Sequence, residues 1–413
     1  MLAPERAVCC SDFPREPPMQ GVRNREAVPS RGLADRTSEP WRVGVLFSMT
    51  GFVSVVEETQ LRGTLLAIDE INSSGGVLGR ELVPVIYDPG SEAPAFGQLA
   101  KRLIVEDKVT TIFGGYTSSC RKTVVPMLER LDALLWYPTP YEGFEASTNV
   151  IYTGPGPNQN IVELCRFLLE RFGSRFFLVG SNYVYAHGVN RLVKELIRDR
   201  ATIVGERYVD LHARRHDFLA IVNDIKQLRP DVIFSTLVGN SAVYFQQAYC
   251  DAGFDVRKAP IASLTTAEAE IDAMGYDVGE GHITADPYFQ SVATAANDGF
   301  IQRYKRRFGG DASTNMCAEA AYFQVHLFAK ALAQAQTMEV DVLRQAIAGI
   351  DFDAPQGNVL VNGASNHANL WTRIGRANRQ GQFDILSQSY HSVNADPFLA
   401  GLARAEAVEG LRS

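Results

Sequence analysis

Short apolar runs alternate along most of the chain with segments whose apolar residues recur at helical spacing. From Trp41 onward, residues 42–47 form the first β-rich run, and Leu61, Leu65 and Ile68 follow at helical spacing. Further strands are predicted at 83–87, 110–113, 134–137, 176–180, 203–209, 232–236 and from Ile261, and helices at 99–105, 160–172, 190–198, 218–228, 244–253, 300–308 and 318–335. This order predicts repeated βαβ units and therefore an α/β fold with parallel sheets.

A cluster of glycine and proline residues at 154–157 divides this pattern into two Rossmann-like lobes. We expect lobe 1 at 41–153, completed by about 288–360, and lobe 2 at 154–287, completed by about 361–398. Because the helices predicted at 300–308 and 318–335 are needed to cover the first sheet, the chain is expected to cross between the lobes more than once. Several crossovers together make a hinge.

The two ends of the chain are expected to lie outside the lobes. Residues 1–40 are rich in arginine and proline and contain no apolar run of the length found in secretory signals, which predicts a disordered leader. Residues 399–413 are expected to form a C-terminal tail. Without an export signal, the expected location is the cytoplasm.

The composition is typical of a globular protein, with 46% hydrophobic and 21% charged residues in 413 positions. The net charge is −7 and no basic block stands out, which excludes a nucleic-acid-binding surface. No apolar run approaches the ~18 residues that a membrane span needs. A small molecule or another protein is therefore the expected partner.

Hydroxyl-bearing residues follow several predicted strands. The stretch from Trp136 to Phe144 places Tyr137 and Thr139 between two prolines, which stiffen the turn, and residues 116–119 bring more hydroxyls to a predicted helix start. Open α/β sheets bind ligands at these strand ends. The alternative is that both stretches are ordinary strand-to-helix connections with capping residues.

Metal chemistry and catalysis are not expected. The six cysteines and seven histidines show no CxxC, HxH or HExxH spacing, so neither a metal site, a disulfide framework nor a cofactor is predicted. Cys120 lies at a predicted helix start beside Arg121 and Lys122, a setting that lowers the pKa of a thiol. No residue is placed to act as its base, and we predict that the protein is not an enzyme.

Six segments in this order resemble the type I periplasmic-binding-protein family of the Leu/Ile/Val-binding class. They lie at 67–76, 119–122, 137–143, 156–160, 263–266 and 353–357, and the resemblance runs from about Val43 to Phe398. Within this family the chain most resembles the branch that handles urea and short-chain amides. The sequence Tyr-Pro-Thr-Pro-Tyr-Glu-Gly at 137–143 is similar to that of amide-sensing negative regulators of aliphatic amidase expression, whereas urea-importer proteins carry Val-Gln at 139–140.

The resemblance implies that a short amide or urea lies between the lobes. The residues that match the family's ligand contacts are Ser118, Tyr137, Thr139, Pro140, Tyr183 and Thr265, with the rings of Tyr116 and Tyr185 nearby. Residues 186–188 and Asp286 depart from the sensor pattern. Such a neutral ligand needs hydroxyl and backbone groups rather than a buried charge, and the strand end at 261–266 is uncharged until Glu268, which argues against an amino-acid ligand.

Two functional hypotheses follow. In the first, the protein is a cytoplasmic amide sensor that regulates amidase expression through an antiterminator-type protein partner. In the second, it is the periplasmic binding component of an ABC importer for urea or short-chain amides and works with a permease. Either function is compatible with a homo-oligomer.

Glu142 either reaches the ligand cleft or bonds the backbone of its own turn.

Overall fold

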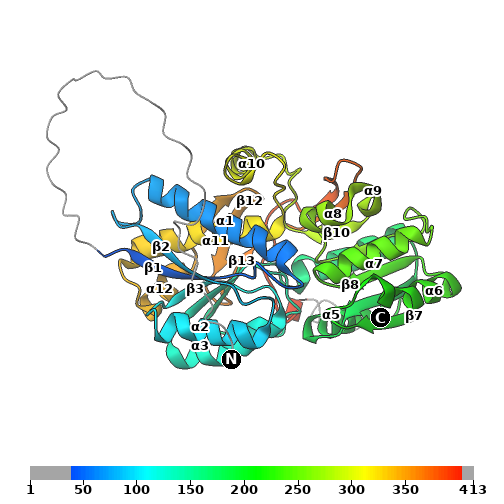
Figure 1. Cartoon of the computed structure of the whole chain (residues 1–413), viewed down its shortest axis with the longest axis horizontal. Coiled ribbons are helices and arrows are strands. Elements are labelled where there is room, and N and C mark those ends of the chain that lie inside the picture. Colours follow the sequence, from blue (N-terminus) through cyan, green and yellow to red (C-terminus); the bar gives the residue numbers. More distant parts are fainter. Residues whose placement is uncertain (1–38, 402–413) are drawn as a thin grey trace, which may run out of the picture.

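The computed structural model describes residues 39–401, which form two α/β lobes side by side (Figure 1). The predicted leader lies almost entirely outside these residues, and so does most of the predicted tail. Each lobe is built on one sheet with helices on both faces. The two-lobe α/β fold predicted from the sequence is confirmed.

The first lobe contains an eight-stranded sheet in the order β11-β12-β13-β5-β4-β3-β1-β2. Its strands are β1 (Trp41–Leu46), β2 (Leu82–Tyr87), β3 (Thr111–Gly114), β4 (Leu134–Tyr137), β5 (Val150–Tyr152), β11 (Asp351–Ala354), β12 (Gly357–Asn362) and β13 (His367–Asn369). Its helices are α1 (Ser54–Ser73), α2 (Ala93–Val105), α3 (Ser118–Leu131), α10 (Ala295–Phe308), α11 (Met316–Ala335) and α12 (Val340–Ile347). Helices α2 and α3 cover one face, and α1 and α11 cover the other (Figure 1).

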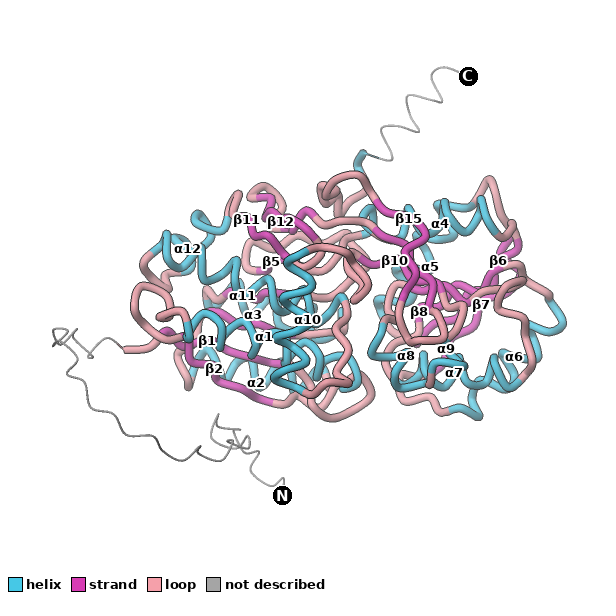
Figure 2. The backbone as a smooth tube through the Cα atoms, turned by 90° about the horizontal axis from the view of Figure 1, so that it is seen from above, coloured by secondary structure: helices cyan, strands magenta, loops and turns pink. Residues whose placement is uncertain are grey.

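The second lobe contains a seven-stranded sheet in the order β15-β14-β10-β9-β8-β6-β7. Its strands are β6 (Arg175–Ser181), β7 (Thr202–Val209), β8 (Val232–Thr236), β9 (Ile261–Ser263), β10 (Ile283–Asp286), β14 (Arg373–Ala377) and β15 (Phe383–Gln388). Its helices are α4 (Ile161–Arg171), α5 (Val184–Ile197), α6 (Leu219–Leu228), α7 (Asn240–Asp251), α8 (Glu268–Met274) and α9 (Tyr276–Gly279), with short 3-10 turns at Pro157–Gln159 and Arg215–Phe218. Figure 2 shows this lobe beside the first.

The N-terminal strands of each sheet run parallel, as predicted, but the C-terminal strands do not. Strands β11, β12 and β13 pair antiparallel to one another, and β14 pairs antiparallel with both β10 and β15. The chain crosses between the sheets after β5, β10 and β13, which confirms the expected repeated crossing. Because β13 belongs to the first sheet, we propose that the last return to the second lobe begins near residue 370 rather than 361.

Helices α1 and α11 approach each other closely over the first sheet. A side-chain carbon at Gly63 of α1 would lie 2.2 Å from the carbonyl oxygen of Ala318 in α11, so only glycine allows this approach. Near the same contact, Thr59 of α1 hydrogen-bonds the side chain of Asn315, the residue before α11. Most residues of α11 are buried. This helix pair fixes the start of α11, which reaches the interlobe cleft.

We expect Gly63→Ala to lower the melting temperature, because the added methyl group forces α1 and α11 apart at a cost of ~1 to 3 kcal/mol. Gly299→Ala, also within a helix, is the matched control. Its methyl group would meet only the mobile guanidinium end of Arg303, so the higher helix propensity of alanine is expected to leave stability unchanged or raised. Thermal unfolding of both variants measures the difference, and equal melting temperatures would refute the close contact.

Candidate functional site

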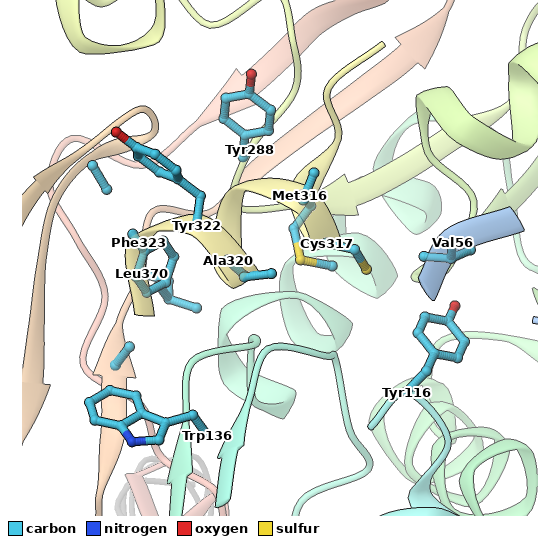
Figure 3. Close-up of a cluster of buried hydrophobic side chains, with 14 of the residues drawn as sticks. Val56, Tyr116, Trp136, Tyr288, Met316, Cys317, Ala320, Tyr322, Phe323 and Leu370 are labelled. Atoms are coloured by element: carbon cyan, nitrogen blue, oxygen red, sulfur yellow. The ribbon is translucent and has the colours of Figure 1, made fainter. Parts of the chain in front are cut away.

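A small cavity lies between the two lobes at the carboxyl ends of the parallel strands. The first lobe contributes Val56, Tyr116, Pro140, Asn315, Met316 and Cys317, and the second contributes Thr265, Ala267, Glu270 and Asp286. Figure 3 shows Tyr116 and Val56 opposite the start of α11, where Met316 and Cys317 lie. The space open to the centre of a water molecule is about 10 Å³, which is close to what one water needs.

The lobes touch at the edge of this cavity. The backbone N–H of Asn240 in the second lobe donates to the carbonyl of Phe52 in the first at 3.0 Å. The ring of Phe52 also meets the ring of His212 edge-on, with centroids 5.1 Å apart. Because these contacts join the two lobes directly, the structure is that of a closed cleft.

The loop after β4 is held by hydrogen bonds within the first lobe. The hydroxyl of Tyr137 donates to the carbonyl of Tyr116 at 2.5 Å, and the hydroxyl of Thr139 donates to the carbonyl of Gly115 at 3.1 Å while accepting from Gln60 at 2.9 Å. Both hydroxyl hydrogens are therefore committed to protein acceptors. The backbone of Thr139 also packs so tightly on Gly154 that a side-chain carbon there would lie 2.2 Å away.

A buried guanidinium group lies behind this loop. The Arg121 side chain is 0% exposed, pairs with Glu142 and Glu145, and stacks on the rings of Tyr137 and Tyr141. Although burial opposes ionisation of Glu145, the charge of Arg121 lowers the pKa of this carboxyl to about 2. Arg121 therefore fixes the loop through charge as well as through packing.

The hydroxyl of Ser118 is engaged by the same ion-pair network. It donates to Glu142 at 2.5 Å and accepts from the guanidinium of Arg121 at 3.2 Å. Glu142 accordingly does more than bond the backbone of its own turn, because it links the loop to the start of α3. Neither Ser118 nor Glu142 lines the cavity.

The predicted second-lobe residues lie at two strand ends. Tyr183 is the residue before α5 and Tyr185 lies in its first turn, with ring centroids 6.0 Å apart and the hydroxyl of Tyr185 buried without a partner. The hydroxyl of Thr265 donates to the carbonyl of Leu237 at 2.9 Å. Of the eight predicted residues, the structure thus brings Tyr116, Pro140 and Thr265 to the cavity wall, and it places the other five outside that wall.

Two carboxyl groups in the cavity wall were not predicted from the sequence. Glu270 accepts the N–H of Ala267 with one oxygen and leaves the other unpartnered, and Asp286 also has a buried oxygen without a partner. Burial raises the pKa of Glu270 to about 7, and burial beside Glu268 and Glu270 raises the pKa of Asp286 well above its usual range. The second-lobe wall therefore contains two carboxyl groups beyond the uncharged strand end at 261–266.

Cys120 does not have the properties of a nucleophile. Burial raises the pKa of its thiol to about 12, which is opposite to the predicted direction. The sequence suggested a lowered pKa because Arg121 and Lys122 follow directly, but both side chains pair with Glu142 and Glu145 instead. Among residues 39–401, no group of three or more His, Cys, Asp or Glu side chains is arranged to hold a metal ion.

The chain belongs to the periplasmic binding proteins, because the model of the periplasmic binding protein domain matches residues 41–404. A leucine-, isoleucine-, valine-, threonine- and alanine-binding protein of Pseudomonas aeruginosa is 25% identical over 338 residues, which covers 77% of this chain and 84% of the relative. Leu/Ile/Val-binding protein homolog 8 of Brucella melitensis is 25% identical over 385 residues, with 86% and 91% covered.

Solved structures with the same fold include solute-binding proteins of ABC transporters. One from Rhodopseudomonas palustris, in complex with p-hydroxybenzoic acid, superimposes with a TM-score of 0.78 at 20% identity and covers 89% of this chain and 100% of that chain. A branched-chain amino acid transporter substrate-binding protein from Streptococcus pneumoniae, in complex with isoleucine, gives a TM-score of 0.75 at 18% identity, with 86% and 100% covered. No helix within residues 39–401 is long and apolar enough to cross a membrane.

We expect Arg121→Met to destabilise the protein strongly, because it leaves Glu142 and Glu145 without their buried cation. Losing one partner of a buried ion pair costs ~3 to 5 kcal/mol. Lys122→Met is the matched control, since Lys122 pairs with the same carboxylates but its side chain is 39% exposed, and exposed pairs contribute only ~0 to 1 kcal/mol. Thermal unfolding of both variants in the absence of ligand checks this, and similar melting temperatures would contradict a structural role for Arg121.

The stability of the free protein should also depend on Glu268, which burial keeps protonated by raising the pKa of its carboxyl to about 8. Between the unfolded pKa near 4.5 and the folded value near 8, the folded state binds more protons than the unfolded state, so stability falls as pH rises through this window. The melting temperature of wild type should therefore drop more from pH 5 to pH 8.5 than that of Glu268→Gln. Parallel pH profiles would show that this carboxyl titrates normally.

Proposed function

We propose that the protein is a periplasmic solute-binding protein that takes a urea or short-chain amide into the interlobe cavity and passes it to an ABC permease. The observation that carries this proposal is the set of polar oxygens in the cavity wall that have no donor partner in the protein. Glu270 and Asp286 present unpartnered oxygens, and the oxygen of Thr265 can only accept because its hydrogen is donated to Leu237. A ligand rich in N–H groups matches this wall.

The amide chemistry also suits a hydrogen-bond donor in the first-lobe wall. The Tyr116 hydroxyl lies in the cavity wall, and burial raises the pKa of this phenol well above its usual range, so it keeps its proton. It can donate to the carbonyl oxygen of urea or of an amide, whose N–H groups then face the second lobe. Asn315 donates one of its two amide hydrogens to Thr59, so at most one remains for a ligand.

The size and charge of the cavity separate this chain from the solved structures of the same fold. A cavity of about 10 Å³ holds about one water, so the wall has to move apart for any ligand, and it has to move less for a ligand of four heavy atoms than for an aromatic ring. A benzoate-like ligand would also bring a negative charge next to Glu270 and Asp286. We therefore infer a small ligand without a carboxylate.

The periplasmic importer component replaces the cytoplasmic sensor as the preferred function, because the family match and the ABC-transporter solute-binding proteins of the same fold favour it. The regulator is retained as a second candidate on one observation, the sequence at 137–143, which resembles that of amide sensors. Affinity purification from the native host separates the two. Recovery with an ABC permease supports the importer, and recovery with an antiterminator-type protein that acetamide releases supports the regulator.

Calorimetry should detect binding of acetamide, propionamide and urea, each recovered chemically unchanged. A ligand of about four heavy atoms at no more than ~1.5 kcal/mol per atom reaches about −6 kcal/mol, which corresponds to a Kd of tens of micromolar. Isoleucine and 4-hydroxybenzoate are the controls and should give no heat, because both exceed the cavity and carry a carboxylate. Tight binding of either control, or no heat from any of the three small ligands, would overturn this proposal.

A further inference from the structure

The second-lobe wall of the cavity contains carboxyl groups with which no basic residue in the described part of the chain pairs. Asp286 and Glu270 are each 1% exposed and line the cavity, and each has an oxygen without a hydrogen-bond partner. Glu268 is buried close by, and its charge acts on Asp286. Among residues 39–401, none of these three carboxyl groups forms an ion pair, and no basic residue lines the cavity.

One source of positive potential does lie at the cavity, but it is too weak to balance two carboxylates. Helix α11 begins at Met316, so its N-terminal end faces the wall formed by Glu270 and Asp286. The end of a helix acts like roughly half a positive charge. Two ionised carboxylates would therefore leave about one and a half negative charges uncompensated in a cavity closed to water.

We propose that the ligand is a small planar cation of the amidinium or guanidinium class, and that Asp286 and Glu270 determine this specificity. The inference rests on the proposed binding of urea-like ligands between the lobes, and it adds that the ligand carries a positive charge. Guanidinium has the shape and the heavy-atom number of urea, and acetamidinium those of acetamide, so the same cavity admits them. Each replaces the carbonyl oxygen by an N–H donor.

The hydrogen-bonding groups of the cavity suit such a cation. A carboxylate pairs with an amidinium or guanidinium through two parallel hydrogen bonds, which are stronger than bonds between neutral groups. The oxygen of Thr265, whose hydrogen is donated to Leu237, accepts a further N–H. The oxygen of Tyr116 is able to accept another, since a phenol is both donor and acceptor.

Calorimetry with matched pairs of ligands tests the inference in the wild-type protein. Guanidinium is compared with urea and acetamidinium with acetamide, at pH 8 and constant ionic strength, with tetramethylammonium as a cation that lacks N–H donors. We expect each planar cation to bind about 10- to 100-fold more tightly than its neutral counterpart, as charged hydrogen bonds imply. Tetramethylammonium should not bind.

Substitutions assign the preference to particular residues. In Asp286→Asn and in Glu270→Gln, the ratio of the urea Kd to the guanidinium Kd should fall at least about tenfold. Gln at 270 is still able to accept the N–H of Ala267, which preserves the start of α8. Glu268→Gln is the control, because Glu268 is buried in the same cluster but does not line the cavity, and its ratio should fall less than in either wall variant.

The outcomes distinguish this inference from the function on which it rests. Binding of urea and acetamide without any preference for their cationic counterparts overturns the inference and leaves the proposed function standing. A cation preference that survives both wall substitutions also overturns the assignment to Asp286 and Glu270. If none of the four ligands binds to wild type, the proposed function fails as well. Because the central comparison uses wild-type protein, poor folding of one variant does not prevent a decision.

Discussion

The buried guanidinium of Arg121 is the constraint on which the ligand-facing part of the first lobe depends. A full positive charge without access to water requires matched negative groups, and Glu142 and Glu145 supply them. These carboxylates belong to the chain that follows Pro140, so the charge balance anchors the very loop that forms one wall of the cavity. At Asp286 in the second lobe, no basic residue among residues 39–401 supplies such a balance, and burial beside Glu268 and Glu270 favours the neutral carboxyl.

Hydrogen bonds within the protein decide which part of the ligand each wall can recognise. The hydroxyl hydrogens of Tyr137, Thr139 and Thr265 are all donated to backbone carbonyls. Hydroxyl groups are often regarded as interchangeable donors and acceptors, but here the fold has already assigned their direction. Preorganised groups of this kind need no rearrangement when a ligand arrives, so less binding free energy is lost in ordering the site.

The sequence predicted the fold well where the periodic signal was long, whereas three of the eight candidate site residues lie in the cavity wall. Strands 134–137 and 232–236 were predicted to the residue, and Tyr116, Pro140 and Thr265 reach the cavity because parallel strands bring their carboxyl ends together. Asp286 ends a four-residue strand with little apolar pattern, so its position in the cavity wall could not be predicted from the sequence. The pKa of Cys120 was misjudged because burial outweighs the charges of its neighbours in sequence, which turn to other partners.

The direct contact between the lobes at Asn240 and Phe52 has a kinetic consequence. A ligand enclosed behind this contact cannot leave while the lobes are together, so its dissociation rate has an upper limit set by how often the hinge opens. Residence time is then a property of the three crossover segments as well as of the ligand's own contacts. Substitutions in those segments would change how long a ligand stays without touching the residues that recognise it.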